Sequence, residues 1–300
     1  MPHRYLILDV FTDRPLTGNP LAVVLDAADL DAERMQAIAR EFNLSETVFV
    51  RNADNLVHTA ALAIFTPRRE LQFAGHPIVG TAVALGRQIA AGDPNRHEQV
   101  AVLELPVGPV RCGVFLRGSD TGHAIFDAPQ TPAAVDMPLD REVIAAALGI
   151  MPGEIGFENH RPSAFTAGLA FAFVPVRDLE AMARVKPVAA AWPAAFAETP
   201  VFAYCRQTEE HGNHFHARAF APAHGIDEDP ATGSAAAALA GVIQSFDQPP
   251  GGGHRYVIEQ GHEIGRPSRI VLELDSENGS VAAVRIGGDA VVVGEGSLVV

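Results

Sequence analysis

Residues 77–84 of the chain read PIVGTAVA, and the same pattern returns at residues 230–237 as PATGSAAA. Both stretches have the form P-x-x-G-[ST]-A-x-A, and adding 153 to a position in the first gives its counterpart in the second. The same offset places Val48-Phe49 on Val201-Phe202. Because the chain has 300 residues, an offset near half its length indicates that its two halves are copies of one fold.

The segments around these stretches predict a mixed α and β protein. An apolar strand and a helical segment precede each Val-Phe pair, which repeats the order of elements in both halves. A turn-rich stretch at residues 127–132 predicts a boundary between a first domain, residues 1–127, and a second, residues 128–288. Asp29 or Asp31 is expected to cap the first helix. We expect strands at residues 4–11, 21–25, 47–50, 57–65 and 171–176, and helices at 31–42, 77–90, 139–148 and 178–184.

Composition excludes several classes of protein. With 48% apolar and 19% charged residues the chain can fill two ordinary globular cores. Its formal charge of −14 disfavours nucleic acids and anionic membranes as partners, because both are bound through Lys and Arg. Two cysteines cannot form a disulfide framework, and no apolar run is long enough to span a membrane or act as a signal peptide. We therefore expect a cytoplasmic protein, and its single lysine, Lys186, disfavours pyridoxal-phosphate chemistry.

The two stretches also suggest where the chemistry lies. His76 and Asp229 occupy equivalent positions, each directly before the proline that is expected to open a helix. The free N–H groups of a helix start bind anions, and glycines beside them (Gly75, Gly80 and Gly233) would let a ligand approach the backbone. Asp229 is equally well explained as an ordinary helix cap, whereas His is a poor cap and favours a functional role for His76. Ser234 and Thr81 lie in the first turns, where a hydroxyl can bind a ligand or its own backbone.

Three further features have competing interpretations. Glu46 begins the first Val-Phe strand and its counterpart is Thr199, so an acid stands on one side only; the alternative is a solvated carboxylate at a strand edge. His211, His214 and His216 could ligate a metal, but with no clear ligand set they are better explained as a strand with a solvated face. Cys112 and Cys205 do not obey the offset and are expected to be ordinary buried cysteines.

Five motifs, in this order along nearly the whole chain, carry a specific resemblance. They are GNPLAVV at residues 18–24, SETVF at 45–49, FAGHP at 73–77, EDPATGSA at 228–235 and QGHEIGRPS at 260–268. Together they resemble the PhzF family of phenazine biosynthesis-like proteins. The resemblance implies the diaminopimelate-epimerase type of α+β fold, with two pseudo-symmetric domains that each wrap a curved β-sheet or barrel around a central helix. It also implies that the active site lies in the cleft between the domains, and that the terminal strand, residues 289–300, returns to the first domain.

The same resemblance implies an isomerase that works without a cofactor or metal and forms a homodimer. Glu46 would be the general acid/base, Asp229 and His76 would act with it, and Ser234 would help to shape the substrate site. The backbone around Gly75 and Gly233 would hold the carboxylate of a small substrate. A carboxyl group can move a proton in both directions near neutral pH if a dry cleft raises its pKa. Arg266 would offset the substrate's charge or brace a loop, and Ile78 departs from the small polar residue usual in the family.

Two other functions stay open at this point. The first is an epimerase or racemase of an amino acid. Related enzymes of this fold use two cysteines at the helix ends, where this chain has Gly75 and Asp229, which speaks against racemisation by two thiols. The second alternative is a protein that binds a small molecule or another protein without catalysis. The sequence does not identify the substrate.

Overall fold

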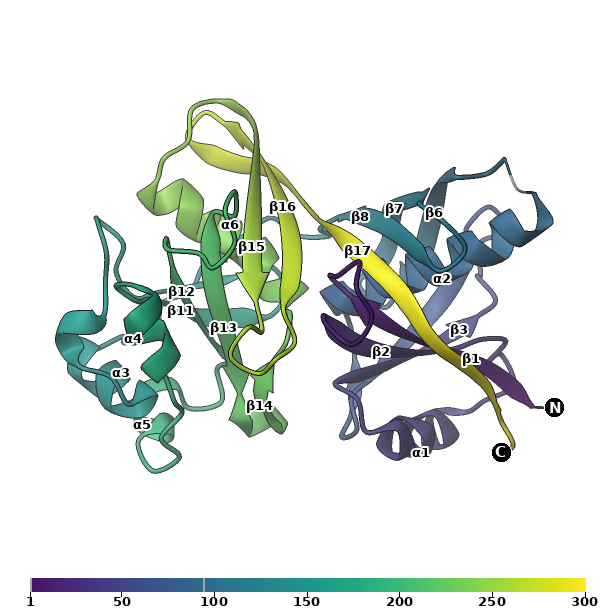
Figure 1. Ribbon diagram of the computed structural model, residues 1–300, viewed down its shortest axis with the longest axis horizontal. Helices are drawn as coiled ribbons and strands as arrows, with labels where there is room; N and C mark the ends of the chain where they lie inside the picture. The colour runs from purple at the N-terminus through teal and green to yellow at the C-terminus, as the bar shows by residue number, and fades with distance from the viewer. Residues whose placement is uncertain (1, 94) are drawn as a thin grey trace. The chain divides into compact units, whose positions relative to one another are not determined.

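The computed structural model describes residues 2–93 and 95–300, which form two compact units (Figure 1). The first unit comprises residues 1–129 and 286–300, and the second comprises residues 130–285. Each unit combines β-strands with one long buried helix, so the fold is of the mixed α+β class that the sequence predicts. Among the residues described, no helix is both long enough and apolar enough to cross a membrane.

In the first unit eight strands form a closed ring. Neighbouring strands pair in the order β1–β2–β3–β4–β6–β7–β8–β17, and β17 pairs with β1 to complete the ring. The short strand β5 pairs with β4 outside this order. The elements are β1 (His3–Val10), β2 (Asn19–Val24), α1 (Ala32–Phe42), β3 (Glu46–Arg51), β4 (Ala60–Phe65), β5 (Glu70–Leu71), α2 (Gly75–Gly92), β6 (Glu98–Leu105), β7 (Gly108–Leu116), β8 (Thr121–Asp127) and β17 (Ser280–Leu298), whose first residues belong to the second unit.

The second unit repeats this topology. β2–β3 are parallel, β3–β4 antiparallel and β4–β6 parallel; β11–β12, β12–β13 and β13–β15 pair in the same three ways. The repeated Val-Phe pairs lie in the corresponding strands β3 and β12, which confirms the duplication. The elements are β9 (Ala133–Ala134), α3 (Arg141–Leu148), η1 (Pro152–Glu154), β10 (Ser163–Thr166), β11 (Ala170–Pro175), α4 (Leu179–Arg184), α5 (Trp192–Phe196), β12 (Val201–Cys205), β13 (Phe215–Ala221), η2 (Pro222–His224), β14 (Ile226–Asp229), α6 (Gly233–Phe246), β15 (Gly252–Gln260) and β16 (Ser268–Glu277).

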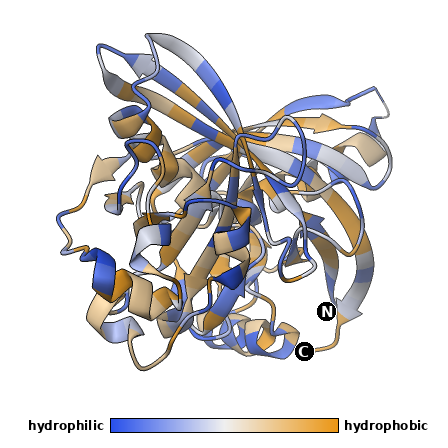
Figure 2. Ribbon diagram, turned by 60° about the vertical axis from the view of Figure 1, so that its left-hand side comes forward, coloured by the Kyte–Doolittle hydropathy of each residue, from blue (hydrophilic) through white to orange (hydrophobic). Residues whose placement is uncertain are grey.

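Helices cover both faces of each sheet. The amphipathic helix α1 packs Met35, Ile38 and Ala39 against the outer face of β3 and β4, and Asp31, one of the two expected caps, accepts a hydrogen bond from the Arg34 N–H. In the second unit α3, α4 and α5 occupy the corresponding outer layer. The central helices α2 and α6 contact strands of their own units on several sides. In Figure 2 much of the hydrophilic colour lies on the loops.

Burial on all sides explains the small residues of the two central helices. Every residue of α2 from Gly75 to Gly86 is buried, as are the alanines of α6 from Ala235 to Ala240. A Cβ atom at Gly80 would lie 2.6 Å from Leu21 Cδ2 and 2.8 Å from Val10 Cγ2. The expectation that Gly80 leaves room for a ligand is therefore wrong, because packing of α2 against β1 and β2 already requires the glycine.

The helices do not begin at the prolines. Helix α2 begins at Gly75, so His76 and Pro77 are its second and third residues, and Ala74 precedes it. Helix α6 begins at Gly233, three residues after Pro230, and Asp229 is the last residue of β14. The expectation that Pro77 and Pro230 open the two helices is therefore wrong, and so is the alternative explanation of Asp229 as a helix cap. Proline is tolerated throughout the first turn because the N–H groups there have no partner within the helix, so it marks the start only approximately.

Candidate active site

In the first unit the fold brings Glu46 and His76 together. Glu46 is the first residue of β3 and His76 the second residue of α2, and Glu46 Oε2 lies 3.4 Å from His76 Nε2. Both side chains are buried. The sequence predicts both residues as members of the site, and this contact places an acid beside an imidazole in a water-poor environment, which suits general acid/base chemistry.

The imidazole of His76 is neutral at physiological pH. Burial disfavours the charged ring and lowers the pKa of His76 to about 3. The contact with Glu46 is therefore not an ion pair of full charges, although the distance would allow one. A neutral imidazole has one N–H donor and one bare acceptor nitrogen, so the partner of each ring nitrogen decides which of them carries the proton.

A third residue of the first unit, Asn19, belongs to this group and was not among the predicted site residues. Asn19 is fully buried at the start of β2, and its Nδ2 lies 3.4 Å from His76 Nδ1. Gly18 has a φ of +69°, and a Cβ atom there would collide with the carbonyl oxygen of Val10, so only glycine fits. A polar residue between a glycine and a proline, followed by an apolar strand, was the signal available in the sequence.

In the second unit hydrogen bonds hold the segment from Asp229 to Thr232. The Thr232 hydroxyl donates to Asp229 Oδ2 at 2.6 Å. Gln260, fully buried at the end of β15, donates from Nε2 to the Asp229 carbonyl at 2.7 Å and to Thr232 Oγ1 at 3.0 Å, and its Oε1 accepts the Thr232 N–H at 3.1 Å. The amide of Gln260 therefore fixes both ends of the segment that leads into α6. Gly233 and Ser234, the first two residues of α6, follow directly.

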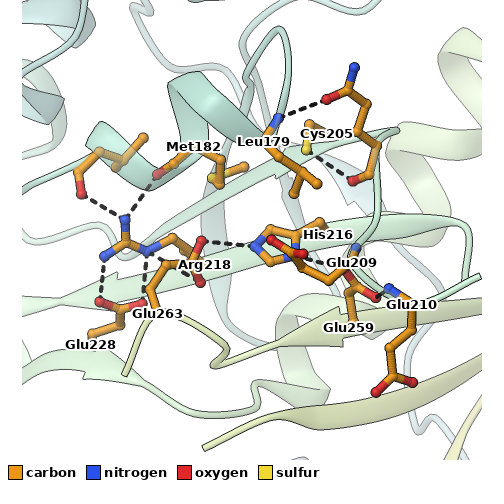
Figure 3. Close-up of polar contacts among 12 residues, drawn as sticks. Leu179, Met182, Cys205, Glu209, Glu210, His216, Arg218, Glu228, Glu259 and Glu263 are labelled. Atoms are coloured by element: carbon orange, nitrogen blue, oxygen red, sulfur yellow. Dashed lines mark hydrogen bonds and ion pairs between the residues drawn. The ribbon is translucent and has the colours of Figure 1, made fainter. Parts of the chain in front are cut away.

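A network of charged side chains holds Glu228, the residue before Asp229 (Figure 3). Arg218 on β13 donates to both carboxylate oxygens of Glu228, from Nε at 2.8 Å and from Nη2 at 2.7 Å. Its Nη1 donates to the carbonyl oxygens of Met182 and Val185. Planar, bidentate pairing of this kind orients both partners. The network extends to Glu263, whose Oε2 lies 3.9 Å from Arg218 Nε.

His216 extends this network from Glu263 to Glu259. Its Nε2 lies 2.9 Å from Glu263 Oε1 and its Nδ1 lies 2.8 Å from Glu259 Oε1 (Figure 3). Burial alone would lower the pKa of His216, but the hydrogen bonds that its ring donates to both carboxylates outweigh this effect and raise that pKa to about 9. The expectation of a solvated strand face is wrong for His216, which is completely buried. His211 and His214 lie before β13 and are exposed, and His214 Nδ1 accepts the Val257 N–H.

An arginine lies within the cluster of possible metal ligands that the described residues form. Among the residues described, the grouping compatible with a metal is Glu158, His160 and Asp247, which the sequence did not single out. The Arg206 guanidinium donates to Asp247 there and lies 3.4 Å from His160 Nε2. A permanent cation already occupies the space between these ligand atoms, so the cluster does not fit a metal ion.

The predicted site residues thus fall into two groups, one in each unit. Gly75, His76 and Glu46 lie together in the first, and Asp229, Gly233 and Ser234 lie within six consecutive residues of the second. That the two groups act on one substrate stays a prediction. Asn19, Thr232 and Gln260 are the polar neighbours that the sequence analysis missed.

Comparison with known proteins identifies close relatives of the chain. A family model described as PhzC-PhzF, phenazine biosynthesis-like protein, matches residues 8–296. An uncharacterized isomerase of Mesorhizobium japonicum is 49% identical, and the trans-2,3-dihydro-3-hydroxyanthranilate isomerase of Pseudomonas aeruginosa is 37% identical; each match covers 98% of both chains. The crystal structure of a PhzF-family phenazine biosynthesis protein of Bacillus anthracis covers 100% of both chains with a TM-score of 0.87 and 25% identity.

Proposed function

Since this chain belongs to the PhzC-PhzF family of phenazine biosynthesis-like proteins and is an isomerase of that family, we propose that it shifts a proton on a small carboxylated metabolite by general acid/base catalysis. The observation that carries the proposal is the buried contact between Glu46 and His76. A carboxyl group with a neutral imidazole beside it can take up a proton and return it without a cofactor.

The proposed step balances within the substrate. The Glu46 carboxylate removes a proton from a carbon of an unsaturated acid, and the electrons of the broken C–H bond move the double bond along the conjugated system. The resulting Glu46 carboxylic acid then donates the proton to a carbon further along, which forms a new C–H bond. Neither oxidant nor reductant is needed, because substrate and product are isomers. The ring of His76 stays neutral and lies beside the carboxyl group of Glu46 during both proton transfers.

The relative from Pseudomonas aeruginosa suggests the first compound to test. Its name states that it isomerises trans-2,3-dihydro-3-hydroxyanthranilate, and 37% identity over 98% of both chains makes this compound, or one like it, our proposed substrate. Backbone N–H groups at Gly75 and Gly233 are proposed to hold the carboxylate, as helix starts do for other anions. Asp229 and Ser234 are proposed to contact the rest of the substrate, and the protein is proposed to act as a homodimer.

Racemisation by two thiols has no support in the positions of the cysteines. Cys112 lies in β7 and Cys205 in β12, and both are fully buried. Neither cysteine therefore stands at the start of α2 or of α6. Burial raises the pKa of each thiol to about 12, so neither would form the thiolate that acts as a base.

The proposal is tested by NMR in D2O. The wild type, Glu46→Gln and the control Glu33→Gln, whose residue is exposed on α1, are each incubated with trans-2,3-dihydro-3-hydroxyanthranilate and with a panel of small unsaturated and amino carboxylates. We expect deuterium to enter a substrate carbon with the wild type and the control, and to fall at least about 100-fold with Glu46→Gln. Equal exchange by all three proteins would overturn the role of Glu46. Binding of a panel member without exchange would favour a non-catalytic binding protein.

A further inference from the structure

We propose that Asn19 is a positioning residue that holds the ring of His76 in the tautomer protonated at Nε2, the nitrogen that faces Glu46. The contact between Asn19 Nδ2 and His76 Nδ1, at 3.4 Å, carries the inference. An amide NH2 group can only donate a hydrogen bond. The nitrogen that receives it must therefore be bare, and the single proton of a neutral ring must lie on Nε2.

The ring has only one proton to place. The hydrogen bond from Asn19 requires a neutral imidazole, since a charged ring would donate from both nitrogens and could not accept. His76 is 4% exposed, and its burial keeps the ring uncharged across the physiological range. Because Nε2 and Nδ1 compete for one proton, the partner at Nδ1 decides the state of the nitrogen at Glu46.

The backbone fixes the amide of Asn19 in its place. Asn19 pairs with Val10 in the antiparallel ladder of β1 and β2, between a glycine that no other residue can replace and Pro20. The side chain of Asn19 is 0% exposed, so its amide cannot replace His76 with water as a hydrogen-bond partner unless the strand moves. The β2 strand also runs parallel to β3, with Leu21 opposite Glu46, so one sheet sets the positions of both partners of His76.

The tautomer has a direct consequence for Glu46. With the proton on Nε2, the partial positive charge of that N–H lies beside Glu46 Oε2, 3.4 Å from Nε2, and favours the ionised carboxylate and so the base form. With the proton on Nδ1, the lone pair of Nε2 would face the same oxygen and would stabilise the protonated acid instead. Asn19 therefore sets the balance between the two forms of the acid/base, a consequence that rests on the proposed function of Glu46.

The tautomer itself is measured without any substrate. Long-range ¹H–¹⁵N NMR of the histidine-labelled protein separates a protonated ring nitrogen from a bare one, and the spectrum of His76→Asn assigns the His76 signals. We expect a bare Nδ1 and a protonated Nε2 in the wild type from pH 5 to pH 9. A protonated Nδ1, or a doubly protonated ring at pH 7, would overturn the proposal.

Two variants test whether Asn19 is the cause. Asn19→Asp replaces the NH2 donor with an acceptor of the same shape, so we expect the proton to move to Nδ1 or the ring to become doubly protonated. Asn19→Ser replaces the amide with a hydroxyl that can still donate, and should retain more of the Nε2–H form than Asn19→Asp. Asn278→Asp, in the turn between β16 and β17, adds the same charge away from the ring and should leave the His76 signals unchanged. Unchanged signals in folded Asn19→Asp would contradict the proposal, and the wild-type spectrum decides the tautomer even if a variant fails to fold.

Kinetics with trans-2,3-dihydro-3-hydroxyanthranilate form a separate arm. We expect Asn19→Asp to lower kcat by about 10- to 100-fold, the usual cost of losing a partner that orients a functional histidine, with KM changed less than about twofold. The pH profile of kcat should also shift, whereas that of Asn278→Asp should not. If the wild type does not turn over this compound, the proposed substrate fails, while the NMR result still decides the role of Asn19. If kcat fell and KM rose by the same factor while the pH profile stayed unchanged, the role of Asn19 would be purely structural.

Discussion

His216 Nδ1 lies 2.8 Å from Glu259 Oε1, and both side chains are almost completely removed from solvent. Burial alone would lower the pKa of His216 and raise that of Glu259. Their mutual hydrogen bond, the one that His216 donates to Glu263 and the one that Asn213 donates to Glu259 reverse both effects. The pKa of His216 is raised to about 9 and that of Glu259 is lowered to about 2. The pair is therefore charged over the whole physiological range and couples stability to pH.

This coupling predicts a maximum in the stability that the pair contributes. The His216 contribution is complete below its unfolded pKa of 6.5 and is lost as the pH rises through 9. The Glu259 contribution is complete above its unfolded pKa of 4.5 and is lost as the pH falls through 2. Urea unfolding of the wild type and of His216→Gln from pH 3 to pH 10 should show the largest difference in unfolding free energy between about pH 4.5 and 6.5. A difference that grows between pH 7 and pH 10 would contradict this assignment.

Replacing Arg218 should be far more costly than replacing a surface arginine. Arg218→Met leaves Glu228 without its bidentate partner in a buried setting and two carbonyl oxygens without donors, so we expect a loss of about 3–5 kcal/mol in unfolding free energy. Arg4→Met removes an ion pair whose side chains are 65% and 79% exposed, and should cost less than about 1 kcal/mol. The two values come from urea titrations under identical conditions. Similar losses for both variants would show that Arg218 does not hold Glu228.

Gln260→Glu should disturb the segment before α6 without changing the size of the side chain. One carboxylate oxygen would replace the Nε2 donor and face the carbonyl oxygen of Asp229 and the hydroxyl of Thr232. We expect a loss of about 1–3 kcal/mol in unfolding free energy, because a buried acceptor loses its donor. Hydrogen exchange at the Thr232 amide should also become faster. Gln248→Glu, at an exposed position after α6, is the matched control and should change neither measurement.

The close packing of α2 gives a prediction about two glycines of one helix. Gly80→Ala places a Cβ atom 2.6 Å from Leu21 Cδ2 and should lower the unfolding free energy by about 1–3 kcal/mol through overpacking. Gly92→Ala, at the last residue of α2, meets no atom within 4 Å and should be neutral or stabilise by up to about 1 kcal/mol. Thermal unfolding of both variants measures the contrast. Equal effects would mean that helix propensity, and not packing, governs Gly80.

Local pattern predicted the duplicated architecture because both halves keep the same spacing of strands and small-residue helices. It also favoured a functional role for His76, whereas the role of Glu46 came only from the resemblance to the PhzF family. The fold brings the two side chains within 3.4 Å of each other. It misplaced the helix starts, since a proline anywhere in or near the first turn produces the same signal. It missed the roles of His216 and Gln260 because their partners lie tens of residues away in the sequence. The periodicity of hydrophobic residues within a segment does not show which distant strands pair. Burial of a charged residue depends on those distant partners.

The last strand of the molecule has a consequence for its synthesis. Strands β1 and β8 are complete once residue 127 has been made, but the strand that pairs with both, β17, ends at Leu298. A nascent chain on the ribosome therefore carries two open strand edges while more than half of the protein is still being translated. Exposed edges of this kind promote intermolecular pairing, so stalled or truncated chains should be the forms that aggregate and that chaperones must protect. The first unit can therefore close only after β17 has been made, and not when residues 1–129 emerge.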